Sequence, residues 1–209
     1  MNLGYIFPKV IGFTISFILF LGFPLNTLAL NESVVLAGGC FWCLEHDLED
    51  VGGVISVQSG YTGGAELNPN YQSHKGHQEA VIVKFDLDQI SYEKLLRSYW
   101  HNIDPLDGGG QFCDRGDSYR PVIFTRTESQ RNDATQSVTK AAKELKKTTS
   151  HIKVQIKDAK EFWLAENYHQ DFASANPLKY NFYRFSCGRD NRLDELWAES
   201  ARTDKEWQN

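Results

Sequence analysis

Methionine is almost absent from this chain of 209 residues, and so is any excess of positive charge. The only methionine is Met1, and 27 acidic side chains outnumber 22 basic ones, for a formal net charge of −5. Because nucleic-acid binding depends on Lys and Arg side chains that neutralise phosphates, this balance argues against nucleic acid as a main partner. No internal repeat or low-complexity tract follows residue 31. With 41% hydrophobic and 23% charged residues, the composition is that of an ordinary globular protein.

Charge is also missing from the first thirty residues, where Lys9 is the only charged side chain. Residues 10–25 are almost wholly apolar, and residues 27–29 offer a small-x-small cleavage pattern. This pattern predicts a secretory signal peptide over 1–29 and one exported, periplasmic catalytic domain over 30–209. The alternative is an uncleaved membrane anchor, although the apolar run is short for a full span. A processed chain would lack methionine, which suits a protein working where methionine is oxidised.

Cysteines are few: Cys40, Cys43, Cys113 and Cys187. Export places them in an oxidising compartment, where disulfides persist. Two structural disulfides are therefore an alternative to redox catalysis. A zinc site made by all four is disfavoured, because the spacing gives only one close pair.

The order of the predicted elements favours an α+β fold. Strands are predicted at 33–37, 54–58, 78–85, 121–125 and 154–156, and helices at 41–50, 92–102, 128–147, 161–173 and 190–201. We expect turns at 60–64, a long loop at 104–119 and an irregular tail at 180–209. Strands interleave with helices, but hairpin-like pairs also occur, so a two-layer sandwich with a mixed sheet is favoured over a doubly wound parallel sheet.

The most informative stretch is Gly38-Gly39-Cys40-Phe41-Trp42-Cys43, between a predicted strand and a predicted helix. A thiol at a helix N-terminus lies among free N–H groups and the positive end of the dipole, and both favour the thiolate. The thiolate is the nucleophile, so we expect sulfur chemistry at Cys40, beside an apolar pocket walled by Phe41 and Trp42. The alternative is a buried cysteine packed among core aromatic residues.

Two further cysteines have competing interpretations. Cys43 completes a C-x-x-C motif, in which the second sulfur of thioredoxin-like dithiols is the buried resolving partner; the alternative is a small apolar core residue. Cys187 lies in a polar stretch, where a mobile thiol can reach a distant sulfenic acid. The alternative for Cys187 is a structural disulfide with Cys113 or Cys43.

Several polar side chains are candidates for proton transfer and substrate binding. Glu79 begins an otherwise apolar strand, and burial beside the thiol would raise its pKa and let it donate a proton near neutral pH. The alternative is a solvated carboxylate at a strand end. Tyr119 and Tyr71 offer phenol hydrogen bonds to a substrate oxygen, and Asp114 is a candidate for an ion pair with Arg115.

Together these pieces resemble one family, the A-type peptide methionine sulfoxide reductases. The motifs that carry the resemblance are Gly39-Cys40-Phe41-Trp42, Gly60-Tyr61-Thr62-Gly63-Gly64, Gly76-His77-Gln78-Glu79-Ala80, Ile103-Asp104-Pro105, Asp114-Arg115-Gly116-x-x-Tyr119-Arg120 and Ala165-Glu166-x-Tyr168-His169-Gln170. They recur in the family's order between residues 33 and 170.

The resemblance implies a ferredoxin-like core and reduction of the S epimer of methionine sulfoxide. Cys40 would attack the sulfoxide sulfur and become a sulfenic acid, while Phe41 and Trp42 would enclose the substrate methyl group. Glu79 would protonate the sulfoxide oxygen, with hydrogen bonds from two tyrosines, Tyr71 and Tyr119, in a network ordered by Asp114. No metal or organic cofactor is needed.

Recycling would use an intramolecular disulfide reduced by a thioredoxin-like protein. The tail lacks the glycine-rich segment that carries resolving cysteines in some branches of the family, so Cys187, in its Ser-Cys-Gly-Arg setting, is the predicted resolving residue. Cys113 receives no role. We expect a monomer that meets the membrane only through an uncleaved N-terminal segment.

Two other functions compete with this one. A thiol–disulfide oxidoreductase would use Cys40 and Cys43 as its dithiol, but the chain lacks a proline-led strand suited to face such a pair. An exported binding domain would lock its cysteines in two structural disulfides. A thiol count with and without a methionine sulfoxide substrate separates all three.

Overall fold

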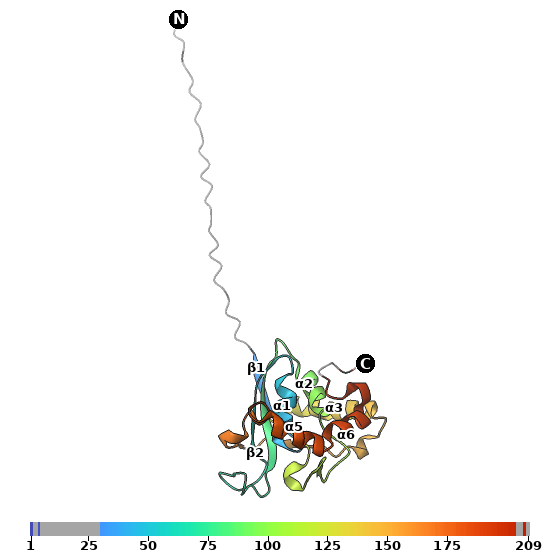
Figure 1. Ribbon diagram of the computed structural model, residues 1–209. Coiled ribbons are helices and arrows are strands. Elements are labelled where there is room, and N and C mark those ends of the chain that lie inside the picture. The colour runs from blue at the N-terminus through green and yellow to red at the C-terminus, as the bar shows by residue number, and fades with distance from the viewer. Residues whose placement is uncertain (2–3, 5–29, 204–206, 208–209) are drawn as a thin grey trace.

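The structure is a computed structural model that describes residues 1, 4, 30–203 and 207 (Figure 1). The predicted signal peptide therefore lies outside the described residues, apart from Met1 and Gly4. Within the described part of the chain, no helix has the length and apolar character needed to cross a membrane.

A six-stranded mixed sheet forms the centre of the fold, with the strands in the order β7-β6-β1-β3-β2-β8. The strands are β1 (Asn31–Ala37), β2 (Val54–Thr62), β3 (Gln78–Asp86), β6 (Val122–Thr125), β7 (Gln155–Asp158) and β8 (Phe162–Leu164). β6 and β7 pair in parallel, and the other neighbouring pairs are antiparallel. A short hairpin of β4 (Gly110–Gln111) and β5 (Asp114–Arg115) forms a second sheet.

Helices pack beside this sheet, as Figure 1 shows. They are α1 (Phe41–Glu49), α2 (Tyr92–Trp100), α3 (Glu128–Glu144), α4 (Phe172–Ala175), α5 (Pro177–Ser186) and α6 (Arg189–Trp197), with 3₁₀ turns η1 (Asp117–Tyr119), η2 (Thr149–His151), η3 (Asn167–His169) and η4 (Ala198–Ser200). The predicted N-cap residues Ser91 and Thr127 are confirmed, because each side chain accepts a hydrogen bond from a first-turn N–H.

The two faces of β1 lie in different parts of the core. Val34 and Leu36 belong to the large cluster that also contains apolar side chains of α1, α2, α3 and α6. Val35 and Ala37, which alternate with them, belong to a smaller cluster on the opposite face. The fold is therefore a mixed α/β structure whose sheet is buried on both faces around β1.

Two predictions, the turn at 60–64 and the helix at 161–173, are wrong in part because β2 pairs with β8. β2 does not turn at Gly60 but continues to Thr62, because residues 60–62 pair with β3 on one side and with β8 on the other. The predicted helix at 161–173 is instead β8, η3 and α4. Gly60 permits the pairing, since a Cβ there would lie 2.4 Å from the Trp163 carbonyl oxygen.

The predicted irregular tail is wrong in part, because Pro177–Ser186 form α5, whereas α6 agrees with the helix predicted at 190–201. Figure 1 shows α5 close to α1, with α6 following it on the right. This placement brings the C-terminal part of the chain to the side of the fold where α1 begins.

Candidate active site

Cys40 is the N-cap residue of α1, at the turn that leaves β1. The two preceding glycines allow this turn to lie against the loop that follows α2. Gly39 has a φ of +88°, and a Cβ there would lie 2.7 Å from Gln111 Cβ. A Cβ on Gly38 would lie 2.7 Å from Ile103. The glycine pair therefore fixes where the Cys40 thiol is presented.

A cavity of about 50 Å³ opens beside Cys40. It collects residues that are far apart in the sequence, and it is lined by Cys40, Phe41, Trp42, Tyr71, Glu79, Asp114, Tyr119 and Tyr183. Every predicted substrate-binding residue is in this set, together with two of the three predicted catalytic residues. Cys187, the third, is not among the lining residues. Tyr183 was not predicted.

Glu79 points into this cavity from β3 and is 2% exposed. Its Oε2 accepts a hydrogen bond from the Phe41 N–H at 3.1 Å, at the first turn of α1. Burial raises the pKa of Glu79 to about 8, and the charge of Asp114 adds to this effect. Glu79 is therefore a mostly neutral acid at pH 7, and the alternative of a solvated strand-end carboxylate is wrong.

Cys40 and Cys43 form a buried pair of free thiols. Burial raises the pKa of Cys40 well above its ordinary value, and its hydrogen bond with Cys43 acts in the same direction. That same bond lowers the pKa of Cys43, and the positive charge of Arg189 also favours ionised Cys43. The expectation that the helix start makes Cys40 a thiolate is therefore corrected: in the resting site burial outweighs it.

Aromatic rings close one side of the cavity. Trp42 stacks on Phe172 of α4 at 3.7 Å between ring centroids, and its Nε1–H donates to His169 Nδ1 at 2.9 Å. Phe41 lies 5.0 Å from the His169 ring. Burial lowers the pKa of His169, which keeps this imidazole neutral and able to accept the hydrogen bond. His169 stands in one of the motifs quoted above, and Phe172 follows it, so the sequence held a signal for both.

The predicted tyrosines lie at the open side of the cavity. Tyr71 is 41% exposed, and its ring lies 4.5 Å from that of His169. The Tyr71 N–H donates to Glu166 Oε1 at 3.0 Å, and the other oxygen of Glu166 accepts from Tyr61, so Glu166 holds this loop to the sheet. Tyr119, at the end of η1, is a hydrogen-bond partner of Glu79.

Asp114 faces the tail rather than Arg115. Its Oδ2 accepts a hydrogen bond from the Tyr183 hydroxyl at 2.5 Å. Arg115 instead pairs with Asp107, so the alternative of an Asp114–Arg115 ion pair is wrong.

A disulfide joins Cys113 to Cys187 across 74 residues. This is one of the alternatives that the sequence left open. The predicted resolving role of Cys187 stays a prediction, and in this state its sulfur is bonded to Cys113 rather than free. Cys43 is the thiol that lies within hydrogen-bond reach of Cys40.

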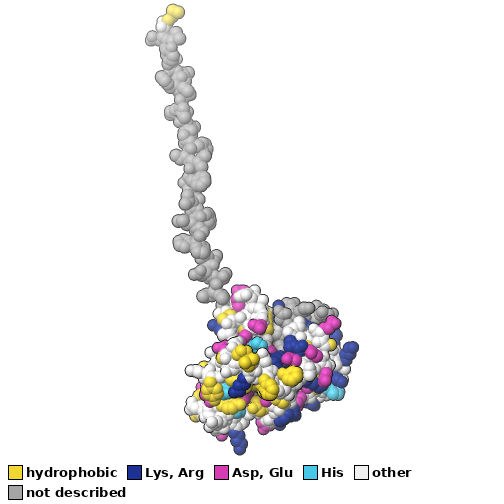
Figure 2. All heavy atoms as spheres, in the orientation of Figure 1, with side chains coloured by type: hydrophobic (Ala, Val, Ile, Leu, Met, Phe, Trp, Pro, Cys, Tyr) yellow, Lys and Arg dark blue, Asp and Glu magenta, His cyan; other side chains and the backbone are white. Residues whose placement is uncertain are grey.

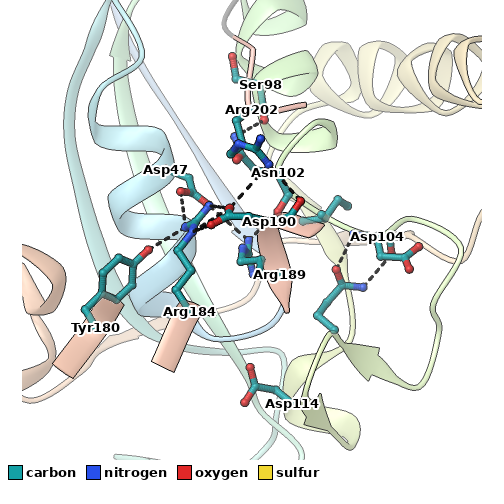
Figure 3. A network of polar contacts seen from close by, with 12 residues as sticks. Asp47, Ser98, Asn102, Asp104, Asp114, Tyr180, Arg184, Arg189, Asp190 and Arg202 are labelled. Carbon is teal, nitrogen blue, oxygen red and sulfur yellow. Dashed lines mark hydrogen bonds and ion pairs between the residues drawn. The ribbon is translucent and has the colours of Figure 1, made fainter. Parts of the chain in front are cut away.

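A network of buried charges ties the tail to α1 (Figure 3). Arg184 Nη1 contacts Asp47 Oδ1 at 2.6 Å and also donates to the Tyr180 hydroxyl. Its other nitrogens bond to Asp190. Arg189 is almost fully buried and lies 3.5 Å from Asp47 Oδ2. These contacts hold α5 and α6 against the helix that carries both free cysteines.

Among the described residues, two groups bring three metal-ligand side chains together. In the first, Cys113 and Cys187 are bonded to each other and offer no thiolate beside Asp114. The second consists of Glu45, Glu49 and Asp171, and burial raises the pKa of both glutamates to about 7, which favours shared protons. Neither group has the four cysteine or histidine ligands of a structural zinc site.

The fold and the cavity together define an enzyme that works through a cysteine thiol beside a neutral carboxylic acid. Comparison with known sequences gives the family. Residues 32–201 match the family described as peptide methionine sulfoxide reductase, and the chain belongs to it.

Named relatives match most of the described chain. This chain is 52% identical over 172 residues to peptide methionine sulfoxide reductase MsrA 2 of Caulobacter vibrioides. The match covers 80% of this chain and 86% of the Caulobacter protein. The chain is 47% identical over 171 residues to MsrA of Ligilactobacillus salivarius, covering 80% and 98%.

Solved structures agree on the fold. Methionine sulfoxide reductase A of Corynebacterium diphtheriae superimposes with a TM-score of 0.65 at 28% identity, covering 71% of this chain and 76% of that one. Reduced Mxr1 of Saccharomyces cerevisiae gives a TM-score of 0.64 at 24% identity, covering 70% and 86%, and supports the fold alone.

Proposed function

We propose that this chain reduces the S epimer of methionine sulfoxide in peptides or proteins. The observation that carries the proposal is the cavity in which a buried thiol, a neutral carboxyl and aromatic walls meet. A sulfoxide oxygen leaves poorly until it is protonated, so a nucleophilic sulfur and a nearby acid are the minimal requirements. Membership of the family supports the substrate class.

The first half-reaction uses Cys40 and Glu79. The Cys40 thiolate attacks the sulfoxide sulfur while Glu79 delivers its proton to the oxygen, to which Tyr71 and Tyr119 donate hydrogen bonds. Trp42 and Phe41 enclose the substrate methyl group. Methionine leaves, and the oxygen is retained as a Cys40 sulfenic acid, so Cys40 is oxidised by two electrons as the substrate is reduced.

Recycling requires a second thiol, and the structure favours Cys43. Attack of Cys43 on the sulfenic acid forms a Cys40–Cys43 disulfide and releases water. The sequence-based alternative is Cys187, whose bond to Cys113 must first open. In either case a thioredoxin-type dithiol then reduces the enzyme disulfide and is itself oxidised, which completes the cycle without a metal or an organic cofactor.

An epimer-resolved assay tests this function. Wild-type protein and a peptide containing both sulfoxide epimers are mixed without reductant, and methionine and free thiols are counted. We expect loss of the S epimer only, one methionine per enzyme, and loss of the Cys40 and Cys43 thiols. Absence of methionine would refute the function.

Two matched variants identify the resolving thiol. Cys187→Ser should still form the Cys40–Cys43 disulfide, whereas Cys43→Ala should release one methionine and accumulate sulfenic acid. Peptide mapping that finds Cys40 joined to Cys187 in the wild type would overturn the role of Cys43 and support the alternative.

We further propose that the protein is an exported, periplasmic monomer with a ferredoxin-like core. The apolar N-terminal run supports export, and the strand order β6-β1-β3-β2, with α1 and α2 contributing to one core cluster, supports the fold. Mass spectrometry of protein from its native host should find an N-terminus near Leu30. An intact Met1 in the membrane fraction would favour an anchor.

A further inference from the structure

Tyr183 is the one cavity residue supplied by the C-terminal helices, from α5. Its hydroxyl donates to Asp114 Oδ2 at 2.5 Å and is also a hydrogen-bond partner of Cys40. Its ring meets the edge of Trp42 at 6.0 Å between centroids. Tyr183 therefore contacts the nucleophile, the predicted polar network and the aromatic wall at once.

The Cys113–Cys187 disulfide joins the two segments that supply this contact. Cys113 directly precedes Asp114, and the Cys187 N–H donates to the Tyr183 carbonyl at 2.9 Å, one helical turn away. The Cys113 N–H also approaches Cys187 Sγ at 3.2 Å. The covalent bond and the Tyr183–Asp114 hydrogen bond thus run side by side between the same two segments.

A separate anchor fixes α5 to the body of the protein. Arg184, next to Tyr183, contacts Asp47 of α1 and Asp190 of α6, and Figure 3 shows this charged network apart from Asp114. Opening the disulfide would leave Arg184 in place on α1. The segment that carries Asp114, which is partly exposed, would lose its covalent link to α5.

We propose that Tyr183 is a further catalytic residue of this site, and that the Cys113–Cys187 disulfide is the positioning device that holds Asp114 and Tyr183 together beside Cys40. This inference rests on the proposed reductase function. It assigns to Cys113 a role at the active site, whereas the sequence offered Cys113 only as a partner in a structural disulfide.

Tyr183 has a single hydroxyl proton, which it can donate either to Asp114 or to the Cys40 sulfur. Burial raises the pKa of Tyr183 far above its ordinary value, so the hydroxyl remains a donor throughout the working pH range. In the resting site it donates to Asp114. When the Cys40 thiolate forms, the same O–H turns to the sulfur, where it lowers the pKa of Cys40.

The first experiment compares Tyr183→Phe with wild type in a single turnover without reductant. Methionine is released before any disulfide forms, so recycling does not affect the readout. A hydrogen bond to a charged group is worth enough to predict a loss of roughly 10- to 100-fold in the rate at saturating substrate. The pH profile of Cys40 alkylation should shift to higher pH.

Tyr92→Phe is the matched control, since it removes a buried phenol hydroxyl from α2, outside the cavity. It should leave the rate and the alkylation profile unchanged. A Tyr183→Phe rate within twofold of wild type would overturn the catalytic role of Tyr183. Absence of methionine from wild type would instead refute the proposed function, so the two failures are distinguishable.

The second experiment tests the disulfide on wild-type protein, which avoids a folding defect. One sample keeps Cys113–Cys187 intact, with two free thiols, and the other is fully reduced, with four. We expect the intact form to release methionine about tenfold faster, and we expect Tyr183→Phe to show no such difference, because coupled groups are not additive. Equal wild-type rates, or the same effect in Tyr183→Phe, would overturn the positioning role.

Discussion

Replacing Glu79 by Gln should slow methionine formation by roughly 10²–10⁴-fold, the usual range for general acid–base catalysis. The amide keeps the shape of the side chain and can still accept from the Phe41 N–H, but it has no acidic proton for the sulfoxide oxygen. The reactive enzyme carries one proton on Glu79 and none on Cys40. Because both groups have raised pKa values, the free enzyme at pH 7 is mostly doubly protonated.

The expected pH profile follows from that proton count. The first proton leaves the pair near the Glu79 pKa of about 8, so the rate at low substrate should rise about tenfold from pH 6 to pH 7 and then level off above pH 8. In Glu79→Gln the rise should move to higher pH, where Cys40 ionises alone. Single-turnover rates below saturation measure this. A wild-type rate that is flat from pH 6 to 8, or a variant within a few-fold of wild type, would refute the role of Glu79.

The same raised pKa predicts an effect on stability. The folded protein binds the Glu79 proton more tightly than the unfolded chain, so this contribution is complete below the ordinary pKa of 4.5 and is lost as the pH rises toward about 8. At pH 7 the loss is roughly 3 kcal/mol. Urea unfolding should therefore show Glu79→Gln gaining stability relative to wild type between pH 5 and pH 8, and a constant difference would contradict the assignment.

Three further predictions concern the thiols and the aromatic wall. Cys40→Ser should form no methionine while its circular dichroism stays unchanged, and substantial activity would refute the mechanism. Removing the Cys113–Cys187 bond, which spans 74 residues, should lower the free energy of unfolding by about 4 kcal/mol by the loop-entropy estimate, and a loss well under 1 kcal/mol in denaturant melts would show that the bond contributes little. His169→Ala should leave the Trp42 N–H unpaired and cost about 1–3 kcal/mol of stability, whereas unchanged stability would mean that water replaces the imidazole.

Much of the cavity was predictable because its residues stand in short motifs at the ends of predicted elements. Cys40, Phe41 and Trp42 are adjacent, and Glu79 begins a strand whose alternation was clear. The chemistry of such residues can be read from their side chains alone. Cys40 follows β1 and Glu79 lies in β3, and these two strands pair in antiparallel fashion.

The tail could not be predicted in the same way, because long-range contacts hold it in place. Arg184 pairs with Asp47, which is 137 residues away, and Cys187 bonds to Cys113. Neither partner is marked by spacing or periodicity. The sequence therefore missed α5, and with it Tyr183. It also misread residues 161–173, where aromatic side chains at helical spacing belong partly to an edge strand.

The position of Cys40 at a helix N-terminus predicted a lowered pKa for its thiol, but in the resting site burial raises that pKa. A helix N-terminus stabilises an adjacent negative charge by about 0.3–1 kcal/mol, and by about 2 kcal/mol in favourable geometry. Burial can shift a pKa by several units, each worth about 1.4 kcal/mol. Cys40 is 6% exposed and lies near Cys43 and Glu79, so burial and neighbouring charge prevail. The thiolate must then be stabilised from the other side of the cavity, and Tyr183 is the neighbouring side chain that lowers the Cys40 pKa.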